Sequence, residues 1–104
     1  MPEVAYEILF AETVQEFMIG LSDRVYNRVR DFVRLIATNP EMGRDYLPEY
    51  EAPSPPMPSK RIVVPRTSVE LYYFIDYDRK AIVMAFACDA RSDPRLKFWH
   101  AYEH

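Results

Sequence analysis

Glycine and cysteine are scarce in this sequence of 104 residues, which contains two glycines and a single cysteine, Cys88. The single cysteine excludes a disulfide-stapled scaffold, and the shortage of glycine excludes a collagen-like repeat. Apolar residues make up 49% of the chain, which excludes an intrinsically disordered protein. A chain of this length has no room for a second hydrophobic core. We therefore expect residues 1–104 to form a single domain.

The sequence also lacks a surplus of positive charge. It contains 13 Lys and Arg residues against 16 Asp and Glu residues, for a formal net charge of −3. This balance argues against a generic nucleic-acid binder, because such proteins are usually basic. The charges are nevertheless uneven, since residues 1–59 have a balance of −5 and residues 60–104 a balance of +2. The overall charge therefore does not exclude an RNA ligand for the second part of the chain.

Long hydrophobic runs are missing as well. The longest purely apolar run, residues 81–88, has eight residues, less than half of what a membrane-spanning helix needs. The N-terminus has neither the basic flank nor the apolar stretch of a signal peptide. We expect a soluble cytoplasmic protein without membrane association, and a single thiol fits a reducing compartment.

The first residues alternate between apolar and other side chains, which predicts a β-strand with one apolar face. That face contains Val4, Tyr6, Ile8 and Phe10. The pattern changes at Thr13, where the sequence Thr-Val-Gln-Glu has the form of a capping box that begins a helix. This short helix is expected to end at Gly20.

A second helix is expected directly after the first one. Ser22 is a good N-cap, and Asn39 ends the helix because a residue before proline avoids the helical region. Apolar residues recur at helical spacing along one side: Val25, Val29, Phe32, Val33 and Ile36. The two helices therefore form a hairpin whose apolar stripe covers other apolar side chains.

Proline is concentrated in residues 40–59, which hold six of the nine prolines and are predicted to form a long acidic loop with extended pieces. Strands are expected over residues 61–64, 69–76 and 81–88, and a short terminal helix from Pro94. The tight spacing favours an antiparallel meander, and the apolar run favours a central position for the last strand. These elements predict an α+β fold, in which an N-terminal strand and a two-helix hairpin precede a three-stranded meander that completes one sheet. The helices are expected to cover one face and leave the other for a function.

Basic residues gather at the ends of the predicted meander strands. Lys60, Arg61 and Arg66 flank the first of these strands, and Arg91 and Arg95 follow the last. Because the end of one meander strand lies beside the start of its neighbour, these basic side chains could lie close together in the folded protein. Converged guanidinium groups suit a phosphodiester, whose oxygens match their forked donors. Solvated charges at strand ends are the alternative interpretation.

The ordered pattern of segments resembles the RelE/ParE superfamily of bacterial toxin–antitoxin toxins. The resemblance rests on the sequence Asn-Pro-Glu-Met-Gly-Arg after the second helix, and on a tyrosine-rich strand, a turn, an apolar strand and then an arginine. The matching stretches are residues 6–10, 37–44, 60–64, 71–76 and 81–94.

This resemblance implies a RelE-like fold and a toxin that a partner antitoxin neutralises, with no cofactor. RelE-like members cleave mRNA on the ribosome, whereas ParE-like members poison DNA gyrase. Both groups share the fold, so the fold alone leaves both targets open. We expect mRNA endonuclease activity. The alternatives are a gyrase inhibitor and a degenerate member that only binds a partner.

The resemblance also implies roles for individual residues. Arg91 matches the family arginine that contacts the scissile phosphate, and Lys60 and Arg61 lie on the strand that carries the family's other catalytic cations. Glu70 departs from the family, whose members commonly have arginine there, so it either repels a phosphate or acts as a general base. Further candidates for substrate contact are Arg66, Arg95, Tyr72 and a terminal aromatic, namely Tyr102, Trp99 or Phe98.

Cleavage in such a nuclease needs no metal ion. A base removes the proton of a ribose 2′-hydroxyl group, which attacks the adjacent phosphate while cations stabilise the developing charge and an acid protonates the leaving 5′-oxygen. Lys60 suits the role of base only if neighbouring cations such as Arg61 or Arg91 lower its pKa.

The remaining notable residues have simpler interpretations. His100 and His104 have the spacing of a metal-binding pair, but incidental residues at a frayed terminus explain them equally well. Core packing explains Cys88, and Tyr72 either stacks on a base or belongs to the core. Solvated faces or antitoxin contacts are the two interpretations for the arginines of the second helix, Arg24, Arg28, Arg30 and Arg34.

Overall fold

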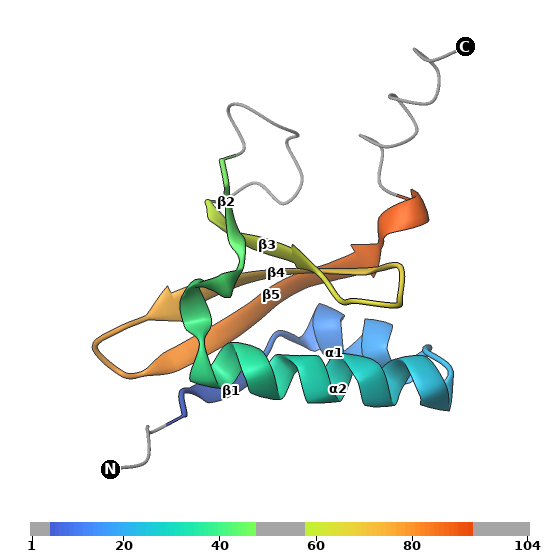
Figure 1. Cartoon of the computed structure of the whole chain (residues 1–104), viewed down its shortest axis with the longest axis horizontal. Coiled ribbons are helices and arrows are strands. Elements are labelled where there is room, and N and C mark those ends of the chain that lie inside the picture. Colours follow the sequence, from blue (N-terminus) through green and yellow to red (C-terminus); the bar gives the residue numbers. More distant parts are fainter. Residues whose placement is uncertain (1–4, 48–57, 93–104) are drawn as a thin grey trace.

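Two helices lie against one face of a five-stranded sheet in the computed structural model, which describes residues 5–47 and 58–92 (Figure 1). The elements are β1 (Glu7–Phe10), α1 (Glu12–Ile19), α2 (Asp23–Thr38), the 3-10 helix η1 (Pro40–Met42), β2 (Arg44–Tyr46), β3 (Ser59–Val63), β4 (Val69–Asp76), β5 (Ala81–Asp89) and the 3-10 helix η2 (Ala90–Ser92). The expected terminal helix lies outside the described residues.

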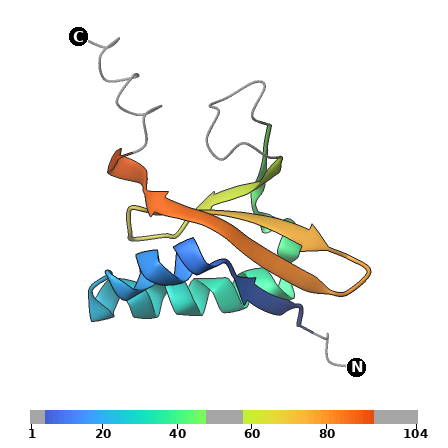
Figure 2. The same cartoon turned by 180° about the vertical axis from the view of Figure 1, so that it is seen from behind.

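The strands follow the order β1-β5-β4-β3-β2 across the sheet. Strands β3, β4 and β5 form the predicted antiparallel meander. Strand β1 pairs with β5 in parallel, and Figure 2 shows the two strands side by side. Strand β5 therefore has a hydrogen-bonded neighbour on each side, which confirms its predicted central position.

The predicted capping box at Thr13 is wrong. The amide of Ala11 donates to the carbonyl of Met84 at 2.9 Å, which continues the ladder between β1 and β5. The carbonyl of Ala11 then accepts from the amide of Gln15, so Ala11 itself is the N-cap and Thr13 lies inside the first turn. Sheet pairing thus determines where α1 begins, whereas Gly20 ends it as predicted.

Helix α2 has the predicted bounds and the predicted buried side. The hydroxyl oxygen of Ser22 accepts from the amide of Val25 at 3.3 Å, and Asn39 caps the other end. The core between the helices and the sheet contains Val14, Met18, Val29, Val33, Ile36, Val64, Val69, Leu71, Tyr73, Ile82 and Met84. Each fully buried aliphatic side chain stabilises the fold by about 1.5–3 kcal/mol.

The long loop with extended pieces that the sequence predicts over residues 40–59 contains two regular elements. Residues 40–42 form η1, and β2 pairs with β3 in antiparallel fashion, with Arg44 opposite Arg61 and Asp45 opposite Lys60. A strand of three residues at a sheet edge is too short to show alternation, so β2 could not be recognised from the sequence pattern. Residues 48–57 of the expected loop lie outside the described part of the chain.

The outer face of the sheet, opposite the helices, is the face that we expected to be left for a function, and its side chains around Tyr72 are buried. An irregularity in the ladder lets Tyr72 face Phe86 and Tyr73 face Met84, so Ala85 is an extra residue of β5. Tyr73 points into the core, whereas Tyr72 points to the outer face and is only 1% exposed. The ring of Tyr72 packs edge-on against Tyr46 and Phe86, with centroid distances of 5.1 and 5.7 Å.

Candidate functional site

A buried carboxylate lies on the outer face of the sheet. Glu70 is fully buried, and its Oε2 accepts from Nη2 of Arg61 at 2.8 Å. Its other oxygen accepts from the hydroxyl group of Tyr72 and lies 4.0 Å from Sγ of Cys88. We call Arg61, Glu70, Tyr72 and Cys88 the Glu70 cluster. The expected position of Cys88 in the core is wrong, because its side chain is half-buried beside a carboxylate.

The strand register brings Arg61 and Glu70 together. Arg61 lies opposite Tyr72, and Glu70 lies opposite Val63, so the two charged residues are diagonal neighbours on one face. Long side chains span such a diagonal. The resemblance singles out Glu70, but the partner of this carboxylate depends on the register of β3 and β4, which the sequence does not reveal.

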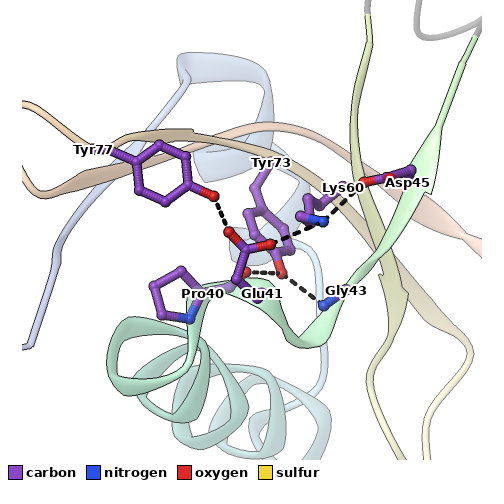
Figure 3. Close-up of polar contacts among 7 residues, drawn as sticks. All are labelled: Pro40, Glu41, Gly43, Asp45, Lys60, Tyr73 and Tyr77. Atoms are coloured by element: carbon purple, nitrogen blue, oxygen red, sulfur yellow. Dashed lines mark hydrogen bonds and ion pairs between the residues drawn. The ribbon is translucent and has the colours of Figure 1, made fainter.

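Lys60 points to the opposite side of the sheet from Arg61, because successive strand residues alternate between faces. Its Nζ lies 2.8 Å from Oδ1 of Asp45 and 3.2 Å from Oε2 of Glu41 (Figure 3). The hydrogen bond that Lys60 donates to Asp45, together with its contact to Glu41, raises the pKa of Lys60 although burial acts in the other direction. The condition under which Lys60 would suit the role of base, a pKa lowered by neighbouring cations, is therefore not met, and Lys60 remains protonated.

The hydroxyl group of Tyr73 lies beside this ion pair. It donates to the carbonyl of Pro40 at 2.8 Å and accepts from the amide of Gly43 at 3.0 Å (Figure 3). Burial raises the pKa of Tyr73, whose side chain is fully enclosed. The hydroxyl group of Tyr77 donates to Glu41, so the same group of residues fastens η1 to the sheet.

Arg91 lies just beyond β5 and is open to solvent. Its guanidinium group binds both oxygens of Asp89, through Nε at 3.1 Å and Nη2 at 2.8 Å, and its side chain is 80% exposed. The hydrogen bond from Arg91 lowers the pKa of Asp89 to about 2. The side chain of Asp89 is less exposed than that of Arg91, and its Oδ1 also accepts from the amide of Arg91 at 2.9 Å.

Arg66 lies at the same end of the sheet as Arg91. The start of β4 pairs with the end of β5, and the amide of Ala90 donates to the carbonyl of Ser68. Arg66 adopts a left-handed conformation with a φ of 64°, and its carbonyl accepts from Nη1 of Arg28 at 3.0 Å. The structure thus brings Arg66 and Arg91 to one end of the sheet, and it places Lys60 and Arg61 on opposite faces.

The structure describes only one of the other candidate substrate contacts, Tyr72. Tyr72 is enclosed by two aromatic rings and holds Glu70, so the prediction that its ring stacks on a base is not supported by its position. The candidates Arg95, Phe98, Trp99 and Tyr102 and the pair His100 and His104 lie outside the described residues.

Three carboxylates that pair with basic residues of the site were not predicted from the sequence. Asp89 lies two positions before Arg91, a spacing that was visible in the sequence. Glu41 and Asp45 reach Lys60 only because η1 and β2 interrupt the predicted loop.

Within residues 5–47 and 58–92, no group of three or more His, Cys, Asp and Glu side chains is placed to hold a metal ion. Neither described helix is long and apolar enough to cross a membrane.

The fold is that of RelE toxins, a class of small α+β proteins. No family model and no curated protein matches the sequence. The isolated RelE toxin of E. coli is similar with a TM-score of 0.66 at 13% identity, covering 96% of this chain and 100% of RelE. Chains of two toxin–antitoxin complexes are also similar. The chain of E. coli RelBE has a TM-score of 0.65 at 14% identity, covering 83% of this chain and 98% of that chain. The chain of Mycobacterium tuberculosis RelBE2 has a TM-score of 0.65 at 18% identity, covering 85% of this chain and 94% of that chain.

Proposed function

We propose that this protein is the toxin of a toxin–antitoxin system, that it is neutralised by a partner antitoxin, and that it acts in the cytoplasm by cleaving mRNA on the ribosome. The observation that carries this proposal is the RelE fold, which extends over nearly the whole of both chains in the comparison with isolated RelE. The guanidinium group of Arg91, which is open to solvent, supports mRNA as the target, because the resemblance to the family assigns the phosphate contact to this residue.

Arg91 has the properties that phosphate recognition requires. Its forked donors are already arranged to bind two oxygens, as the contacts to Asp89 show. A phosphodiester offers the same two-oxygen geometry, and a charge-assisted bond to it strengthens as negative charge develops in the transition state. Arg66 at the same end of the sheet adds a second positive charge.

Neither of the expected bases takes the 2′-hydroxyl proton in this proposal. Lys60 is protonated because two carboxylates raise its pKa. Glu70 is fully buried and receives two hydrogen bonds, so a ribose has no path to its oxygens. The contribution of this chain that the geometry supports is phosphate binding and charge stabilisation by Arg91.

A second candidate function is partner binding without catalysis. The observation in its favour is that each of the three expected catalytic cations has a carboxylate partner: Lys60 with Asp45 and Glu41, Arg61 with Glu70, and Arg91 with Asp89. Carboxylates at these positions reduce the positive potential that an RNA substrate requires.

Expression without an antitoxin separates these functions. We expect growth arrest and mRNA cuts that are phased with codons in primer extension, and we expect both to disappear with Arg91→Ala. The matched control is Arg79→Ala, because Arg79 is also exposed and lies near an aspartate, but in the turn between β4 and β5 at the other end of the sheet. Unchanged cleavage by Arg91→Ala would contradict the assigned role.

The same experiment tests the alternatives. Growth arrest without mRNA cuts, together with loss of DNA supercoiling by purified gyrase, would favour the gyrase inhibitor. Harmless expression of folded protein would favour partner binding alone. A short reading frame beside the gene, whose product copurifies with this protein, would support the antitoxin partner.

A further inference from the structure

The turn between β3 and β4 has an arginine where glycine is the usual residue. The amide of Thr67 donates to the carbonyl of Val64 at 3.2 Å, so residues 64–67 form a β-turn. Pro65 fixes a negative φ at the second position, whereas Arg66 at the third position has a φ of 64°. This combination defines a type II turn, whose third position favours glycine. Arg66 is therefore strained, because its Cβ atom disfavours the left-handed conformation.

A side chain of α2 holds this turn. Nη1 of Arg28 donates to the carbonyl of Arg66 at 3.0 Å, and Figure 1 shows the turn above the first half of α2. Arg28 is half-buried, whereas the other arginines of α2 are exposed: Arg24, Arg30 and Arg34. A hydrogen bond from a charged donor is stronger than one between neutral groups, so this contact offsets part of the strain in the turn.

The same turn leads to the end of the sheet where phosphate binding is proposed. The carbonyl of Ser68, two residues after Arg66, accepts from the amide of Ala90, which directly precedes Arg91. The conformation of the turn sets the direction in which the side chain of Arg66 leaves the backbone. In a relaxed turn with a negative φ at Arg66, this side chain would leave in a different direction.

We propose that Arg28 is a positioning residue, which presents the side chain of Arg66 to the RNA substrate by holding the β3–β4 turn in its strained conformation. The inference rests on the proposed function, since it takes mRNA as the ligand of Arg66. Strain of this kind persists only where the surrounding structure enforces it, and it clusters at functional sites. Arg28 donates to the backbone of the protein, so the substrate contact belongs to Arg66.

Amide hydrogen exchange tests whether Arg28 holds the turn. The substitution Arg28→Met keeps most of the aliphatic stem but removes the donors. We expect the amide of Thr67 to exchange about tenfold faster, because a hydrogen bond from a charged group contributes about that factor to a local opening equilibrium. The matched control is Arg24→Met, which removes the same charge one turn earlier on α2 and should leave this exchange unchanged. Wild-type exchange at Thr67 in folded Arg28→Met protein overturns the inference.

Cleavage of mRNA on ribosomes tests the role in substrate binding. We expect Arg28→Met to raise KM about fivefold without changing kcat per folded molecule, because Arg66 contributes to binding rather than to the chemical step. A merely structural role would lower the folded fraction and leave KM unchanged. Arg28→Lys restores one charged donor, and we expect it to return KM towards the wild-type value. An equal rise in KM with Arg24→Met would show that loss of charge alone is sufficient, which overturns the inference.

A double-substitution cycle separates positioning from direct contact. Glycine adopts the left-handed conformation without strain, so Arg66→Gly keeps the turn without help from Arg28 and removes the substrate contact. We expect Arg66→Gly to raise KM at least as much as Arg28→Met, and the double variant to have the KM of Arg66→Gly. A further rise in the double variant would show that Arg28 contacts RNA itself, contrary to the inference. This comparison also serves if Arg28→Met alone does not fold, because the turn with glycine is relaxed.

Failure of the inference is distinguishable from failure of the proposed function. A wild type that cuts no mRNA contradicts the proposed function, and exchange at Thr67 still decides whether Arg28 holds the turn. A wild type that cuts mRNA, together with an unchanged KM in folded Arg28→Met protein, overturns the inference alone.

Discussion

The hydroxyl group of Tyr73 in β4 accepts a hydrogen bond from the amide of Gly43, at a distance of 3.0 Å. It also donates to the carbonyl of Pro40 at 2.8 Å, so one side chain of the sheet satisfies two backbone groups after α2. This contact fixes where η1 ends and β2 begins. It thereby also sets the position of Glu41 and Asp45, the two partners of Lys60.

We expect Tyr73→Phe to lower the free energy of unfolding by about 1–3 kcal/mol, because the change leaves buried backbone groups without their partner. Urea denaturation measures the difference. The control is Tyr77→Phe, since Tyr77 is 57% exposed and water replaces its lost contact with Glu41. Equal effects of the two substitutions would contradict the structural importance of Tyr73.

We expect Gly43→Ala to destabilise the protein by about 1–3 kcal/mol, the usual cost of overpacking. A Cβ atom at Gly43 would lie 2.7 Å from the hydroxyl oxygen of Tyr73, so the ring or the backbone must move. Gly20→Ala is the matched control, because a Cβ atom there would lie 3.6 Å from its nearest neighbour. Thermal unfolding of both variants checks the expected order, with Gly43→Ala the less stable.

We expect Lys60→Gln to leave growth arrest and mRNA cleavage unchanged while lowering the free energy of unfolding by about 0.5–1 kcal/mol. The reason is that Lys60 pairs with Asp45 and Glu41 rather than acting as a base. Loss of cleavage by a folded Lys60→Gln protein would contradict this prediction and support a catalytic role for Lys60, which its raised pKa argues against.

Asp89 makes stability dependent on pH. Its pKa is lowered from 3.8 to about 2 in the folded protein, because Arg91 binds the ionised form. A lowered pKa stabilises the folded state above pH 3.8, and this contribution is lost as the pH falls towards 2. We expect the wild type to be more stable than Asp89→Asn at pH 5, with the difference shrinking towards pH 2 in urea titrations. A difference that grows in acid would contradict the pairing.

Strong local patterns predicted much of the fold. The stripe of α2, the cap at Ser22 and the meander all follow from periodicity and turn residues, and the structure confirms them. The beginning of α1 and the strand β2 did not follow, because both depend on pairing with strands that are distant in the sequence. Local patterns contain no information about such partners.

The candidate site was less predictable than the fold. Alternation along a strand already places Lys60 and Arg61 on opposite faces, so their separation was readable from the sequence. Their carboxylate partners depend on the register of β2 with β3 and of β3 with β4. The extra residue at Ala85 changes which side chains of β5 face outward, and this brings Phe86 and Cys88 to the Glu70 cluster.

The most direct test of the proposed function is cleavage of mRNA on ribosomes by the purified protein. Ribosomes that hold a defined codon in the A site are mixed with the wild type or with Arg91→Ala, and the 5′ ends of the products are mapped. We predict one cut within that codon by the wild type and none by Arg91→Ala. Intact mRNA after incubation with folded wild-type protein would contradict the proposal that this toxin-fold protein is a ribonuclease.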